Sequence, residues 1–122
     1  MKVFGEILAP VTRRFKPQLI LVSAGYDGHW KDPLAGMGLS VKGYARLMGV
    51  IRGLAVEVCG GRMVMTLEGG YHLEALSYSV LASMRVLLGR DDVVDPLGPS
   101  QSPEPDIEEL LGAVRETHGL ET

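Results

Sequence analysis

Two short apolar runs and three longer stretches of helical periodicity organise the chain. Residues 19–22 and 62–67 are mainly apolar, and each run gives way to small or polar residues. Runs of this length predict strands that are buried on both faces, as in parallel sheets. Apolar residues recur every three or four positions in residues 3–15, 41–58 and 72–88, which predicts helices there.

The residues between these segments set their ends. Pro10 must either kink the first helix or open its second part, and Pro17 must end it. Ser40 is suited to cap the second helix, and glycines follow the second and third helices. Strand, helix and strand with short connections form a βαβ unit with parallel strands. We therefore predict an α/β fold whose third helix, apolar nearly all round, is buried on more than one side.

The C-terminal residues differ in composition from the rest. Residues 90–105 are rich in proline and aspartate, which predicts an extended connector. Residues 106–122 start with spaced apolar positions, which predict a short C-terminal helix followed by a tail. Residues 1–89 are then the α/β unit.

Composition narrows the functional classes. The chain has 122 residues, of which 46% are hydrophobic and 22% charged, and its net charge is −3. These values indicate one globular domain and give no basic surface for nucleic acid. No apolar run is long enough to span a membrane, and the N-terminal residues lack the pattern of a signal peptide. The single cysteine, Cys59, excludes an internal disulfide and is expected to be a small buried residue, so we expect a cytoplasmic protein.

The residues that could carry chemistry gather where the two predicted strands end. Asp27 follows the first strand and Tyr71 follows the second. Because the carboxyl ends of parallel strands meet at one edge of a sheet, both side chains are expected to share a crevice. Asp27 could ligate a metal ion or cap its loop, and Tyr71 could donate a hydrogen bond to an oxyanion or pack at a helix start. Gly69 and Gly70 would let substrate or backbone approach closely, or could cradle a phosphate.

Other polar residues in these connections have simpler interpretations. His29 and Asp32 lie in the same loop as Asp27 and are further candidate ligands. A run this polar is more typical of a solvated loop, which is the interpretation that we favour. Glu68 is expected to hold the turn after the second strand, and His118 is expected to be exposed in the tail.

Three segments carry a resemblance to a known family: VSAGYDGHWKDPLAG, LSVKGYARL and GGRMVMTLEGGYHLEAL. In this order and spacing they resemble the C-terminal portion of the histone deacetylase superfamily, close to its acetoin-utilisation and acetylpolyamine amidohydrolase branches. The resemblance covers about residues 3–89. It implies a three-layer αβα fold with a mainly parallel sheet, and zinc-dependent hydrolysis of acetyl-amides such as acetyl-lysine or acetylpolyamines.

The resemblance also implies roles for individual residues. Asp27 matches the last of three zinc ligands, and Tyr71 matches the residue that hydrogen-bonds the substrate carbonyl and stabilises the oxyanion. Gly69 and Gly70 match the glycines that shape the wall of the substrate tunnel. His29 and Asp32 match no family ligand. Zinc would polarise the acyl carbonyl and activate a water molecule.

The resemblance further implies what this chain lacks. In the family, an Asp-x-His pair supplies the other two zinc ligands and an adjacent histidine pair acts as general base and acid; both lie upstream of the matching region. One carboxylate cannot hold catalytic zinc at useful affinity, because such sites take three protein ligands. We therefore expect that this polypeptide alone binds zinc weakly and is inactive, as the last third of a deacetylase domain would be.

Alternatives from other functional classes stay open at this point. The chain could be a non-catalytic α/β interaction module derived from the same fold, or a phosphate or nucleotide binder that uses the Gly69-Gly70 turn. Without the upstream elements, a sheet edge and apolar faces would be exposed. We therefore expect self-association or a complementary N-terminal deacetylase segment as partner, with an acetylated amine as substrate only of a complete site.

Overall fold

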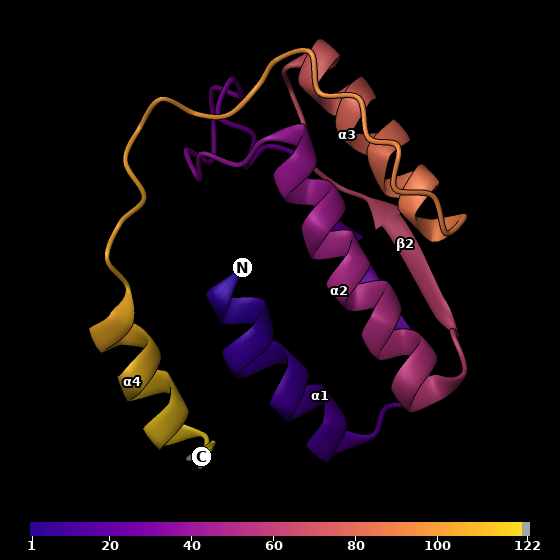
Figure 1. The fold of residues 1–122 in the computed structure, drawn as a ribbon, viewed down its shortest axis with the longest axis vertical. Helices are drawn as coiled ribbons and strands as arrows, with labels where there is room; N and C mark the ends of the chain where they lie inside the picture. The colour runs from indigo at the N-terminus through magenta and orange to yellow at the C-terminus, as the bar shows by residue number, and fades with distance from the viewer. Residues whose placement is uncertain (121–122) are drawn as a thin grey trace.

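The computed structural model describes residues 1–120 and shows an α/β arrangement (Figure 1). A π-helical turn, Phe4–Leu8, runs directly into α1, Ala9–Phe15. There follow β1 (Ile20–Ala24), α2 (Val41–Cys59), β2 (Met63–Leu67), α3 (Leu73–Leu87) and α4 (Glu108–Thr117). The predicted order of helices and strands is confirmed.

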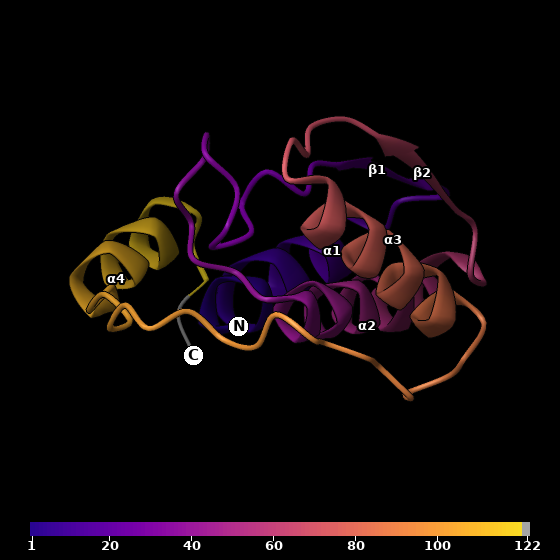
Figure 2. The same cartoon turned by 90° about the horizontal axis from the view of Figure 1, so that it is seen from above.

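The sheet consists of β1 and β2, which pair in parallel. The register aligns Ile20 with Met63 and continues to Ala24 with Leu67. The predicted βαβ unit is therefore confirmed, and so is the α/β fold class. Figure 2 shows the two strands on one side of the molecule, with α2 and α3 on the other. Residues 1–120 thus supply one sheet layer and one helix layer.

The prediction that both strands are buried on both faces is wrong for this chain. Burial alternates along β1, and Leu21 on its outer face is 73% exposed. Val64, the register partner of Leu21 on β2, is 53% exposed. Both side chains are exposed because the helices within residues 1–120 cover one face of the sheet and leave the other open.

The ends of α2 follow the sequence closely. The Ser40 hydroxyl accepts a hydrogen bond from the Gly43 backbone N–H at 3.0 Å, as predicted for an N-cap. Gly60 ends the helix with a φ of 62°, a left-handed conformation that glycine adopts without steric cost. The core cluster between α2 and α3 contains three fully enclosed side chains, flanked by three half-buried ones: Val41, Ala45 and Ala82, with Tyr78, Val86 and Val93.

The prediction that α3 is buried on more than one side is also wrong. Its buried residues are small and form one stripe: Ala75, Ser79, Ala82 and Ser83. Some of its large apolar residues are exposed on the opposite side: Leu73, Leu81 and Met84, joined by Leu88 at the C-cap. Small side chains let α3 lie close to α2, and part of the apolar surface of this helix is left exposed on the other side.

The N-terminal helix and α4 pack together although they lie at opposite ends of the sequence. Pro10 stands just after the π-helical turn, where the helix changes from π to α geometry, so of the two predicted effects of this proline a local change within a continuous helix is the one observed. The Arg115 guanidinium pairs with the Glu6 carboxylate at 2.8 Å, and Lys2 pairs with Glu108. Leu111 of α4 is buried.

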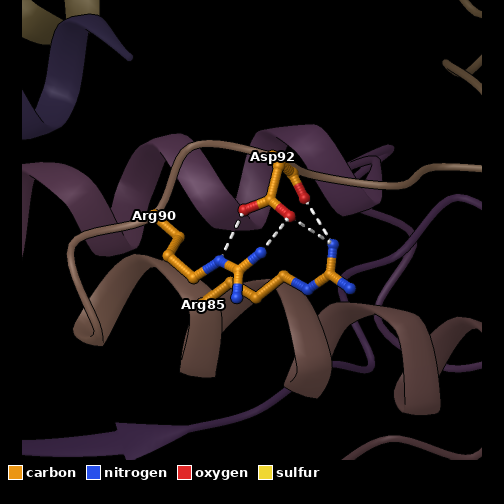
Figure 3. Close-up of polar contacts among 3 residues, drawn as sticks. All are labelled: Arg85, Arg90 and Asp92. Carbon is orange, nitrogen blue, oxygen red and sulfur yellow. Dashed lines mark hydrogen bonds and ion pairs between the residues drawn. The ribbon is translucent and has the colours of Figure 1, made fainter.

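The connector between α3 and α4 has no regular element and follows the surface. At its start, Arg90 contacts both carboxylate oxygens of Asp92 at 2.9 Å, and Arg85 contacts the same residue (Figure 3). Further along, the Trp30 indole N–H donates to the Gly98 carbonyl at 2.9 Å. No helix within residues 1–120 combines the length and apolar character needed to cross a bilayer.

Candidate functional site

The two connections that leave the sheet at its carboxyl edge form a continuous rim, made by residues 25–34 and 68–72. Pairing continues beyond the strands: the Glu68 N–H donates to the Ala24 carbonyl at 3.0 Å, and the Tyr26 N–H donates to the Gly69 carbonyl at 2.7 Å. The Ser23 hydroxyl also donates to the Glu68 carboxylate at 2.8 Å, which is consistent with the expected role of Glu68 at this turn. The rim therefore begins as an extension of the parallel ladder.

The Asp27 carboxylate lies directly against Gly69. A Cβ atom added to Gly69 would stand 3.0 Å from Asp27 Oδ1 and 3.2 Å from Asp27 Oδ2. A Cβ atom added to Gly25 would stand 2.8 Å from Asp27 Oδ1. The carboxylate thus occupies a space that exists because two glycines, one from each connection, have no side chains. Asp27 and the turn after β2 converge at one edge, as the parallel topology predicts.

Gly70 and Tyr71 complete the turn. Gly70 has a φ of 143°, and a Cβ atom there would stand 2.8 Å from Leu76 Cδ1. An L side chain at this position would be both strained and crowded. Tyr71 is 59% exposed, so this residue of the rim is open to solvent.

Asp32 is buried in the rim, and the prediction that it lies in a solvated loop is wrong. Only 7% of the residue is exposed. Its Oδ2 accepts from the Tyr71 N–H at 2.7 Å and from the His72 N–H at 3.0 Å, while Oδ1 accepts from the Leu34 N–H at 3.0 Å. Burial raises the pKa of Asp32, but the three N–H donors outweigh burial, and the net pKa lies below its ordinary value.

His29 is fully buried, so the solvated-loop prediction is wrong here too. Its Nδ1 accepts from the Lys31 N–H at 3.1 Å, and burial lowers the pKa of the ring, which favours neutral imidazole. Asp27 and His29 have the Asp-x-His spacing, but Nδ1 of His29 is occupied and Nε2 is enclosed without a hydrogen-bond partner in the described part of the chain. His29 is therefore a buried residue inside the loop.

Tyrosines under the rim form a second layer that the sequence analysis missed. The rings of Tyr26 and Tyr44 lie 4.9 Å apart, and the Tyr26 hydroxyl donates to the Ser83 hydroxyl at 2.9 Å. Burial raises the pKa of Tyr44 to about 12. A cavity of about 250 Å³ lies between these residues, Asp27 and α2. The available signal was the position of Tyr26 directly at a strand end, between Gly25 and Gly28.

Metal-ligating residues are present but not grouped in the described part of the chain. Within residues 1–120, no three side chains of the histidine, cysteine, aspartate or glutamate type are grouped so that they could hold a metal ion. The Cys59 thiol is buried, as predicted, and donates to the Ala55 carbonyl at 3.3 Å. His118 is exposed, as predicted. The Asp27 carboxylate could supply one ligand at the rim, and its role in metal binding stays a prediction.

Comparison with known proteins places the chain in a family. The family described as Histone deacetylase domain matches residues 1–87, which is more than half of the chain. The chain is 44% identical over 121 residues to "Histone deacetylase 10, chloroplastic" of Oryza sativa subsp. japonica, covering 96% of this chain and 27% of that protein. It is 40% identical over 118 residues to the "Probable deacetylase" of Archaeoglobus fulgidus, covering 96% and 32%.

Solved structures agree with this result. The crystal structure of the HDA15 HD domain matches with a TM-score of 0.74 and 30% identity, over 93% of this chain and 30% of that chain. The chain thus spans about a third or less of the relatives that it matches. The fold and the sequence together confirm the resemblance to the superfamily: the chain belongs to the histone deacetylase domain family.

Proposed function

We propose that this chain forms the Asp27–Tyr71 side of a zinc-dependent deacetylase site that hydrolyses acetyl-amides such as acetyl-lysine or acetylpolyamines. The observation that carries the proposal is the contact of the Asp27 carboxylate with Gly69, at the sheet edge where the turn to Tyr71 begins. The names of its relatives, which are deacetylases, support the reaction class.

Each residue of the rim has a chemical task in this proposal. Asp27 is one oxygen ligand of the zinc ion. Tyr71 donates its O–H to the oxyanion that develops on the acyl carbonyl, and Gly69 and Gly70 let the substrate approach the backbone. Bound zinc would supply Lewis acidity for the carbonyl and for an attacking water.

The isolated chain is expected to be inactive under this proposal. Catalytic zinc sites take three protein ligands, and residues 1–120 contain no group of three suitable side chains. The family's Asp-x-His ligands and its histidine pair would come from another polypeptide segment. A non-catalytic interaction module is the alternative function, and it predicts that no added segment restores turnover.

A chimeric enzyme tests the proposal. This chain replaces the matched region of the Archaeoglobus fulgidus probable deacetylase, and turnover of an acetyl-lysine peptide and of an acetylpolyamine is measured. We expect zinc-dependent turnover that Tyr71→Phe lowers about 10²–10³-fold in kcat, the usual effect of losing one oxyanion donor. Tyr78→Phe, on the packed side of α3, is the matched control.

The outcomes separate the two functions. An inactive chimera beside an active parent enzyme, or equal kcat values for Tyr71→Phe and Tyr78→Phe, would contradict the deacetylase proposal. Zinc-dependent turnover by the isolated chain that Tyr71→Phe abolishes would contradict the expected inactivity and leave the reaction class standing.

The open outer face of the sheet supports a partner for this chain. Leu21 and Val64 form an exposed apolar surface on the sheet, and the outer edge of each strand has no partner strand within residues 1–120. We propose that a complementary deacetylase segment covers this face. Self-association is the other outcome, and a monodisperse monomer in light scattering, unchanged when such a segment is added, would contradict both.

A further inference from the structure

Asp32 connects the two halves of the rim. It lies on the loop after β1, but two of the three hydrogen bonds of its carboxylate reach the turn after β2: Oδ2 accepts from the backbone N–H groups of Tyr71 and His72, at 2.7 and 3.0 Å. The third, from the Leu34 N–H to Oδ1 at 3.0 Å, fixes the carboxylate within its own loop. Both oxygens are therefore occupied by backbone donors.

The Asp32 carboxylate restrains the backbone at Tyr71. The donors are main-chain N–H groups, so the two bonds restrain the orientation of successive peptide planes at Tyr71 and His72. A buried carboxylate needs such partners, since an unpaired buried charge is costly. His72 in turn caps α3, because its Nδ1 accepts from the Ala75 N–H at 3.2 Å. Tyr71 is thus fixed on both sides, by the carboxylate and by the helix start.

We propose that Asp32 is a positioning residue for Tyr71: its carboxylate holds the backbone of the turn so that the Tyr71 phenol is presented at the rim beside Asp27. The inference rests on the proposed function of Tyr71. It adds a residue to which the resemblance assigns no role, and it couples the metal-ligand loop to the phenol.

A second contact separates this role from general stabilisation of the rim. The Tyr26 N–H bond to the Gly69 carbonyl, at 2.7 Å, joins the same two connections without Asp32. The Asp27–Gly69 contact lies beside that bond. Loss of the Asp32 carboxylate should therefore loosen Tyr71 and His72, while the contact between Asp27 and Gly69 persists.

Amide NMR on the full chain tests the inference. In the wild-type chain, the Tyr71 and His72 amide signals should shift together as Asp32 is protonated, at a pH below the ordinary aspartate value of 3.8. Asp32→Asn should abolish this shared shift and accelerate exchange of both amide protons at neutral pH by at least 10-fold. His72, His29 and Tyr44 are the titratable side chains that interact with the charge of Asp32, and their own signals are followed in the same experiment.

Asp106→Asn is the matched control. The Asp106 carboxylate also accepts a backbone N–H, that of Glu108 at 3.0 Å, but it is exposed and lies at the start of α4. This variant should leave the Tyr71 and His72 amides unchanged. Two results would overturn the inference. Unchanged amide exchange in Asp32→Asn would show that the carboxylate does not hold these N–H groups. Equally faster exchange throughout α2 and α3 would show that the substitution lowers the stability of the whole chain.

Kinetics of the chimeric deacetylase distinguish this inference from the proposed function. Asp32→Asn should lower kcat about 10-fold with little change in KM, and it should lower kcat much less when Tyr71→Phe is already present. Additive losses would overturn the positioning role while leaving Tyr71 catalytic. If Tyr71→Phe itself has no effect on kcat, the proposed function fails, whatever the NMR result.

Discussion

The rim and the outer face of the sheet are built in opposite ways. At the rim, two polar side chains are buried and accept hydrogen bonds from backbone donors, Asp32 through its carboxylate and His29 through Nδ1. On the outer face, apolar side chains such as Leu21 and Val64 are exposed. Polar side chains are thus buried at the rim and apolar side chains are exposed on the outer face, whereas in most proteins polar residues are exposed and apolar residues are buried.

This difference teaches which part of the molecule is complete in itself. In the rim, the Asp32 carboxylate finds all three of its hydrogen-bond donors within residues 1–120, whereas Nε2 of His29 finds no partner there. The outer face exposes Leu21 and Val64, and exposed contiguous apolar surface favours association. The chain therefore combines a hydrogen-bonded rim with a sheet face that the described residues leave uncovered.

The largest expected loss of stability comes from a substitution within the rim. Gly70→Ala should lower the free energy of unfolding by about 2–5 kcal/mol, because a φ of 143° strains an L residue and the new Cβ would meet Leu76 at 2.8 Å. Gly36→Ala is the control, since its φ of 63° is strained but its surroundings are open, and about 1–2 kcal/mol is expected. Urea unfolding measures both. Equal losses for the two variants would show that the rim is not tightly packed at Gly70.

The next largest effect compares the stability cost of a lysine on the two faces of β1. Val22→Lys places a charge on the half-buried inner face and should destabilise the chain by about 2 kcal/mol or more. Leu21→Lys, one residue earlier on the outer face, should change stability by less than about 0.5 kcal/mol and should weaken self-association in light scattering. A large loss of stability in Leu21→Lys would mean that the outer face is covered in the folded chain.

The smallest effect concerns an ion pair that belongs to neither region. Arg13 on α1 contacts the Glu57 carboxylate on α2 at 2.7 Å, and this contact lowers the pKa of Glu57 from 4.5. A lowered pKa in the folded state gives stability that is present above pH 4.5 and is lost as the pH falls through the folded value. Glu57→Gln should therefore flatten the stability profile slightly in acid. The difference should shrink in high salt, because both groups are exposed, and a salt-independent difference would contradict this explanation.

Features fixed by neighbouring residues could be predicted from the sequence. Ser40 and Gly60 end α2 through a local hydrogen bond and a left-handed backbone conformation. Both depend on the residue type at that position, so they could be predicted. Parallel pairing of β1 and β2 followed from one helix joining two apolar runs. The convergence of Asp27 with the turn after β2 followed in turn from that topology.

Features fixed by distant residues could not be predicted. Asp32 is buried because the backbone N–H groups of Tyr71 and His72 bind its carboxylate. These residues follow α2 and β2 in the sequence, so the polar stretch around Asp32 does not indicate them. The Tyr26 hydroxyl likewise finds Ser83 on α3. Exposure of Leu21 depends on which elements cover the sheet, and an apolar run is equally compatible with a covered or an open face.

The central claim is that the rim of this chain supplies Asp27 as a zinc ligand beside the Tyr71 phenol. Calorimetric titration of zinc into the metal-free chimeric deacetylase tests it most directly. Asp27→Asn should weaken zinc binding by about 10-fold or more, whereas Tyr71→Phe and Asp106→Asn should leave the zinc affinity unchanged. Zinc affinity that is the same in Asp27→Asn as in the parent chimera would contradict the account.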